Sequence, residues 1–151
     1  MKVSKAKVGE NRGAILEAAG RLFRERGCAG VSVSDVMTAA GLTHGAFYGY
    51  FRSKEELVAA TLAELVAAPR PSPSRAEAVA LYLAPEHRDD PAGGCPVAAL
   101  ASEAARASQE TRQALADGVE RMILRQGGDD PAKRRAAVGR VAAMVGALIL
   151  A

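Results

Sequence analysis

The chain has 151 residues, of which 49% are hydrophobic and 25% charged, and this globular composition excludes an intrinsically disordered or collagen-like protein. It contains 33 Ala but only three Phe, three Tyr and no Trp, which favours closely packed helices over an aromatic-filled β-sandwich. The longest uncharged apolar run, residues 141–151, is shorter than the roughly 20 residues of a membrane span. We therefore expect a soluble all-α protein with no membrane partner. The basic N-terminus has no apolar stretch behind it, so we expect a cytoplasmic location.

The net charge of +3 is distributed unevenly along the chain. Residues 1–60 carry nine Lys or Arg against six Asp or Glu, whereas residues 61–151 carry eleven of each sign. A basic N-terminal part can attract a polyanion such as DNA, although a merely solvated surface is the commoner explanation for a modest excess.

Apolar residues that recur at every third or fourth position predict helices throughout the first half. The predicted ranges are about 9–26, 34–41, 43–51 and 53–68. We interpret Ser34 and Thr43 as N-caps, and Ser53 with Glu56 as a capping box. Three prolines within residues 69–73 then predict a boundary between two halves, because proline cannot continue a helix.

The second half is also predicted to be helical, with no strand-like alternation. The predicted helices cover about 74–84, 96–107, 108–126 and 130–151, and residues 85–94 are predicted as a loop. Ser74, Ser108 and Asp130 are the expected caps. The last helix ends within an apolar stripe, so we expect the second domain to be incomplete.

Residues 31–55 form the most informative segment, which predicts two short helices joined by a tight turn at Gly41. The second helix has small, uncharged residues on its outer side, including Gly45 and Gly49, so a large partner can approach its backbone. The major groove of DNA fits such a helix, whose N-terminus favours a phosphate. The alternative is an ordinary bundle with a glycine-weakened helix.

This segment resembles the DNA-binding domain of TetR/AcrR-type transcriptional regulators. The similarity is carried by residues 32–36, 40–51 and 53–57, above all by the Phe-Tyr-x-x-Phe-x-x-Lys spacing that starts at Phe47. Met37 departs from the small residue that is commonest at its position. Residues 82–103, with their Gly-Cys-Pro sequence, resemble one branch of the same family.

The resemblance implies a two-part architecture. Residues 1–68 would form a three-helix DNA-binding domain with its helix-turn-helix at about 33–52, and residues 74–151 would form a helical ligand-binding and dimerisation bundle. It also implies a homodimer on a double-stranded, pseudo-palindromic operator, acting as a repressor that an unknown small molecule releases. A helical interaction module that does not bind DNA is the alternative function.

Carried over residue by residue, the resemblance gives a set of candidate DNA-binding positions. They are Ser34, Thr43, His44, Gly45, Phe47, Tyr48 and Lys54.

Within this set, Tyr48 and Lys54 match phosphate-gripping positions, although Lys54 could simply be solvated. Ser34 and Thr43 would combine capping with phosphate contact, or only cap. His44, Gly45 and Phe47 match base-proximal positions, with the hydrophobic core as the alternative for Phe47. Lys5, Lys7 and Arg12 could reach phosphates from the N-terminal arm, or remain solvated.

For the second half, the candidate ligand-binding residues are Tyr82, Cys95, Met122 and Met144. Cys95 would begin a helix, where the dipole favours a thiolate, so it could sense oxidants or electrophiles; the alternative is a small apolar residue in a tight turn. The two cysteines, Cys28 and Cys95, have no metal-site spacing, and the two histidines suggest no catalytic set. We expect no cofactor, no metal and no enzymatic activity.

Overall fold

The computed structural model describes residues 4–68 and 74–151. Every regular element in those two ranges is helical, which confirms the all-α prediction. The predicted proline-rich boundary at residues 69–73 lies outside the described residues. None of the described helices combines the length and apolar character needed to cross a bilayer.

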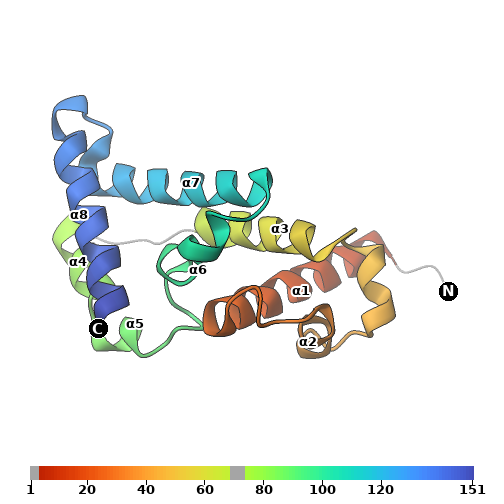
Figure 1. Ribbon diagram of the computed structural model, residues 1–151. Coiled ribbons are helices and arrows are strands. Elements are labelled where there is room, and N and C mark those ends of the chain that lie inside the picture. The colour runs from red at the N-terminus through yellow and green to blue at the C-terminus, as the bar shows by residue number, and fades with distance from the viewer. Residues whose placement is uncertain (1–3, 69–73) are drawn as a thin grey trace.

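The first half contains three α-helices and one 3₁₀ helix (Figure 1). They are α1 (Lys5–Arg26), α2 (Val33–Ala39), the 3₁₀ helix η1 (His44–Gly49) and α3 (Lys54–Ala67). Helix α1 begins four residues before the predicted start, because the Ser4 side chain caps it by accepting from the Lys7 backbone N–H.

The second half contains five α-helices and one π-helical turn. They are α4 (Arg75–Tyr82), α5 (Pro85–Arg88), α6 (Pro96–Ala104), α7 (Gln109–Ile123), the π-helical turn η2 (Leu124–Gly128) and α8 (Pro131–Leu150). Helix α5 lies in the segment predicted as a loop; its first residue is Pro85, whose fixed φ suits the first turn of a helix.

Most of the predicted helix caps are present, and one is wrong. Ser53, Ser74, Ser108 and Asp130 each accept a backbone N–H at the start of a helix. Ser34 does not cap α2: the cap is Ser32, which accepts from the Asp35 N–H at 3.1 Å while Asp35 accepts from the Ser32 N–H at 2.8 Å. Thr43 does precede η1, but its side chain makes no capping bond.

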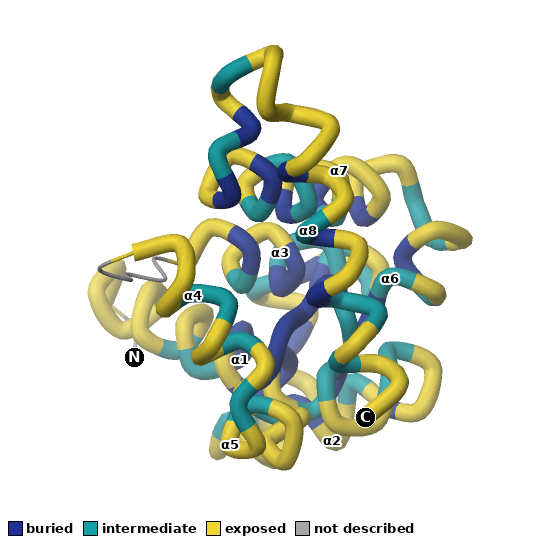
Figure 2. Tube along the Cα trace, turned by 90° about the vertical axis from the view of Figure 1, so that its left-hand side faces the viewer, coloured by how far each residue is buried: buried dark blue, intermediate teal, exposed yellow. Residues whose placement is uncertain are grey.

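Helices α1, α3 and α7 lie side by side, with α3 in the middle (Figures 1 and 2). Helices α2 and η1 lie at one end of this stack, and α4, α5 and α8 lie at the other (Figure 1). The main core runs from the aromatic side chains of Phe23, Phe47 and Phe51 along α3 to α6 and α7. A smaller core around Ile123 and Val141 joins α7 to α8.

Helices α3 and α7 are in tight contact at Gly118. A Cβ atom built on Gly118 would lie 2.6 Å from Cγ1 of Val66 and 3.0 Å from its Cβ. Both atoms belong to a β-branched side chain, which cannot swing away easily. Only glycine fits at position 118 without moving one of the two helices.

We expect Gly118→Ala to destabilise the protein by about 1–3 kcal/mol, since it overpacks the contact between α3 and α7. Gly13→Ala is the matched control: position 13 is inside helix α1 and its added Cβ would meet nothing within 4 Å. That control should be neutral or stabilising by up to about 1 kcal/mol. Urea unfolding measures both values, and equal effects would contradict the packing argument.

Two polar ties join α6 and the loop before it to the end of α1. Glu103 of α6 accepts backbone N–H groups from Cys28 at 3.2 Å and from Ala29 at 2.9 Å. Arg24 of α1 donates from Nε to the carbonyl of Ala92 at 2.7 Å. These hydrogen bonds hold the second half against the first, because each bond to a charged group is strong and directional.

The Glu103 carboxylate also affects the neighbouring thiol. Burial raises the pKa of Cys28 to about 11, the negative charge of Glu103 contributes in the same direction, and the positive charge of Lys54 opposes it. Cys28 is therefore a protonated thiol at neutral pH.

We expect Glu103→Gln to lower the pKa of Cys28, since the thiolate would no longer face a carboxylate. The pH midpoint of iodoacetamide labelling at Cys28, followed by peptide mass spectrometry, measures this. Glu86→Gln on the exposed helix α5 is the control and should leave the midpoint near 11. An unchanged midpoint in Glu103→Gln would show that the carboxylate does not act on the thiol.

Candidate functional site

The 3₁₀ helix η1 stands on an aromatic base. Phe47 and Phe51 are buried with ring centroids 5.8 Å apart and nearly parallel planes. The side-chain amide of Asn11 donates to the Tyr50 hydroxyl at 2.8 Å, which ties the end of η1 to α1. The position of η1 is thus fixed from below by packing and from the side by a hydrogen bond.

The sequence predicted an ordinary helix over residues 43–51, whereas the structure has a 3₁₀ helix over His44–Gly49. Its sequence explains the difference. Gly45 and Gly49 are poor α-helix formers, and the aromatic residues between them are only moderate ones. Short 3₁₀ pieces tolerate such a sequence better than a long α-helix does.

The outward side of η1 is small, open and uncharged. His44, Gly45, Tyr48 and Gly49 are all exposed, with Tyr48 69% exposed. A Cβ on Gly45 or Gly49 would meet nothing within 4 Å, so no other part of the described chain covers this face. A flat partner could therefore contact the backbone of η1 directly.

The other candidate residues lie in different surroundings. Ser34 and Thr43 are exposed, at the start of α2 and of η1. Phe47 is only 1% exposed, so its assignment as a base-proximal contact is wrong and the core alternative holds. Lys54 is half-buried at the start of α3, where its charge acts on Cys28 and Asp35.

One cationic side chain, Arg12, lies against the aromatic base, and other cations lie near it in the sequence. The guanidinium of Arg12 lies 5.2 Å from the centre of the Phe51 ring, which is a cation–π distance. Lys7 pairs with Glu10 at 3.2 Å, and Lys5 is exposed. The Arg52 side chain is 92% exposed and was not among the predicted residues. Its position directly after Phe51, close behind η1, is a sequence signal that could have identified it.

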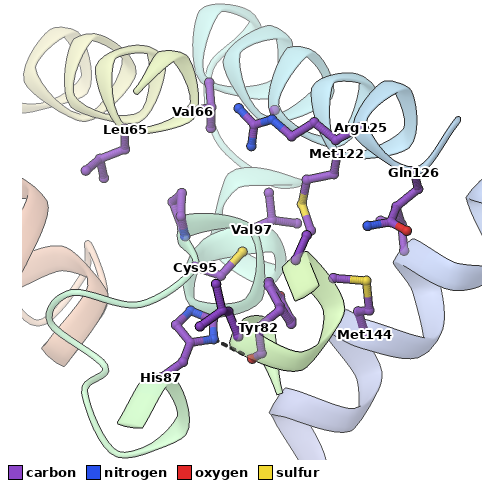
Figure 3. A pocket seen from close by; sticks show the side chains of 15 residues that line it. Leu65, Val66, Tyr82, His87, Cys95, Val97, Met122, Arg125, Gln126 and Met144 are labelled. Atoms are coloured by element: carbon purple, nitrogen blue, oxygen red, sulfur yellow. Dashed lines mark hydrogen bonds between the residues drawn. The ribbon is translucent and has the colours of Figure 1, made fainter. Parts of the chain in front are cut away.

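A cavity of about 270 Å³ lies in the opposite half (Figure 3). Its walls come from α3, α4, α6, α7, η2 and α8, and from the short helix α5. The four predicted ligand-binding residues, Tyr82, Cys95, Met122 and Met144, all line it. Cys95 is buried just before the first turn of α6, as a free cysteine.

Sequence reasoning missed two polar residues in the wall of this cavity, His87 and Gln126. They lie on opposite sides in Figure 3, with His87 beside Cys95 and Gln126 beside Met144. No three His, Cys, Asp or Glu side chains within residues 4–68 and 74–151 gather as potential metal ligands. The cavity is therefore a mainly apolar space with a few polar atoms, which is typical of small-molecule sites.

Comparison with known proteins relates the first half of the chain to one family. Residues 15–61 match the family described as bacterial regulatory proteins, tetR family. This segment is a TetR-family domain. A 62-residue segment is 44% identical to the HTH-type transcriptional regulator TtgR of Pseudomonas putida, and a 51-residue segment is 43% identical to the HTH-type transcriptional repressor KstR2 of Mycobacterium tuberculosis. These segments are 41% and 34% of this chain, but only 30% and 26% of the two relatives.

The likeness extends beyond the matched segment at the level of the fold. A putative TetR-type transcriptional regulator from Streptomyces avermitilis superimposes with a TM-score of 0.67 over 92% of this chain and 84% of its own, at 25% identity. The helical second half is thus arranged as in that regulator, and it forms most of the cavity wall together with the end of α3.

Two adjacent aromatic residues give a test of the site geometry. We expect Phe47→Ala to cost about 3–5 kcal/mol of folding stability, since it empties the base under η1. Tyr48→Ala should change stability by no more than about 0.5 kcal/mol, because that side chain is exposed. Chemical unfolding compares the two variants, and similar losses would contradict the assignment of Phe47 to the core.

Proposed function

We propose that this protein is a sequence-specific DNA-binding transcriptional repressor that acts as a homodimer on a pseudo-palindromic operator. The observation that carries the proposal is the open, uncharged face of η1, held rigidly on a buried aromatic base and flanked by Arg12 and Arg52. Such a face can enter the major groove while the flanking cations contact phosphates. A bacterial repressor of this kind would act in the cytoplasm, where the chromosome lies.

The candidate roles follow from exposure. His44 is the proposed base-reading residue, and Gly45 allows close approach to the bases. Tyr48, Lys54, Ser34 and Thr43 are the proposed phosphate contacts. Lys54 is half-buried, so part of its side chain would pack against the protein while its ammonium contacts a DNA phosphate.

Homodimer formation is supported by apolar side chains that α8 leaves exposed. Val138 is 44%, Ile149 62% and Leu150 88% exposed. A second copy would remove these side chains from water, which favours association. In the dimer bound to its operator, the two η1 helices would lie about 34–36 Å apart or a multiple of that distance.

We further propose that a small molecule in the cavity releases the operator. Helix α3 supports the proposal because it connects the two sites. Lys54 is in its first turn, shortly after η1, and Leu65 and Val66 near its end line the cavity. Its 14 residues span about 20 Å. A ligand that prefers a form in which the two η1 helices are wrongly spaced must lower DNA affinity by linkage.

Selection of bound DNA from a random pool tests DNA recognition. We expect enrichment of an inverted repeat with half-sites about 10–10.5 base pairs apart, or a multiple of this. Sedimentation equilibrium on the same preparation should give the mass of a dimer. No enrichment above the starting pool would favour the helical interaction module.

Substitutions of the candidate DNA-binding residues should affect DNA affinity or base preference, according to whether the residue contacts a phosphate or a base. Lys54→Ala and Tyr48→Ala should weaken binding to all sequences. Lys54→Ala should also reduce the slope of log affinity against log salt by about 0.9 for each copy, or about 1.8 for the dimer. His44→Ala should instead relax preference at one base position. Fluorescence anisotropy at several salt concentrations, together with repeated selection for the His44 variant, measures these effects.

Lys133→Ala on α8 is the matched control for Lys54→Ala, since its exposed ammonium lies on the far half of the molecule and pairs with Asp130. It should leave both affinity and salt slope unchanged. An equal loss in the two lysine variants would mean that net charge, rather than contact at position 54, sets DNA affinity.

A further inference from the structure

Within the described part of the chain, no negatively charged side chain lines the cavity. The lining residues described there include no Asp or Glu, and Arg125, which carries a permanent charge, belongs to an exposed residue. A cation that entered would lose its hydration without gaining a carboxylate partner, which is costly in an apolar space. The cavity therefore disfavours the binding of cationic ligands.

One wall carries a histidine whose free nitrogen is an acceptor. Nδ1 of His87 lies 2.6 Å from the backbone carbonyl oxygen of Tyr82, and a carbonyl can only accept, so Nδ1 carries the proton. In the neutral ring this leaves a lone pair on Nε2. That atom is buried and has no hydrogen-bond partner among the described residues.

The opposite wall carries a second acceptor. Gln126 is only 3% exposed, and its side-chain Oε1 is buried without a hydrogen-bond partner in the described part of the chain. Its backbone carbonyl is already used, because Arg140 of α8 donates to it. The π-helical turn that holds Gln126 is thus fixed by α8, with the amide left at the cavity wall (Figure 3).

Buried polar atoms are rarely left without partners, so two acceptor atoms on residues that line one apolar space favour a ligand that donates. A carboxylate would place its own lone pairs against those of Nε2 and Oε1. A hydroxyl group donates one hydrogen bond and carries no charge. The methionines and Val97 would surround its apolar part.

We propose that the cavity binds an uncharged, mainly apolar molecule with a hydroxyl group, and that this hydroxyl donates to Nε2 of His87. The proposal deepens the proposed function and rests on the cavity being the effector site. Binding itself is measured without DNA, so the two can fail separately.

The test uses four probes of matched size: 4-propylphenol, its methyl ether 4-propylanisole, 4-propylbenzoate and trimethyl(4-propylphenyl)ammonium. Isothermal titration calorimetry on the full chain should give the phenol at least tenfold tighter binding than each of the other three. The ether matters most, because it keeps the shape of the phenol and cannot donate.

Two variants assign the selectivity to residues. His87→Asn keeps a donor that can reach the Tyr82 carbonyl but removes Nε2, so the preference for phenol over ether should fall to less than threefold. Glu86→Gln is the control, since it changes an exposed side chain next to His87 that does not line the cavity, and it should keep the tenfold preference. Circular dichroism and thermal unfolding check that both variants fold.

The proposal is overturned if the ether, benzoate or ammonium probe binds as tightly as the phenol, if His87→Asn keeps the full preference, or if none of the probes binds up to its solubility limit. Operator release by the phenol is a separate anisotropy titration. Selective binding by a protein with no affinity for DNA would support the ligand class and reject the repressor; release of the operator without selectivity would do the reverse.

Discussion

The contact between α3 and α7 at Val66 and Gly118 is the constraint on which the arrangement depends. Helix α3 belongs to two structures at once, since its first part packs on the aromatic base of η1 and its last turn forms a wall of the cavity. Because α7 can approach so closely, the second half has a continuous core with the first. The cavity and the DNA-binding candidates at η1 therefore share one helix, α3.

The architecture could largely be predicted from the sequence because its signals are local. Periodic apolar positions located most helices, and the side chains of Ser53, Ser74 and Ser108 act as expected. Failures occurred where two local solutions compete. Ser32 and Ser34 both lie near the start of the same helix, and only the Asp three residues after Ser32 completes a capping box, which decides between them.

The functional surface was only partly predictable, since exposure depends on tertiary packing. Phe47 and Tyr48 are neighbours in sequence, yet one is buried and the other faces outward. The four predicted ligand-binding residues lie far apart in the sequence, yet all of them line one cavity. His87 and Gln126 could not be predicted as cavity residues. Each matters because it has one buried acceptor atom without a hydrogen-bond partner in the described part of the chain, and such an atom is visible only in the structure.

The two ties between α1 and the α6 region differ in how they would tolerate substitution. Arg24 is held by a backbone carbonyl, so nearly any residue at position 92 could supply the acceptor. Glu103 supplies the acceptor from its own side chain, and the space beside Gly27 that it fills leaves no room for a Cβ there. Substitution at position 92 would therefore have little effect on this tie. A side chain at position 27, by contrast, would be strained by the positive φ of 75° as well as by the Glu103 carboxylate.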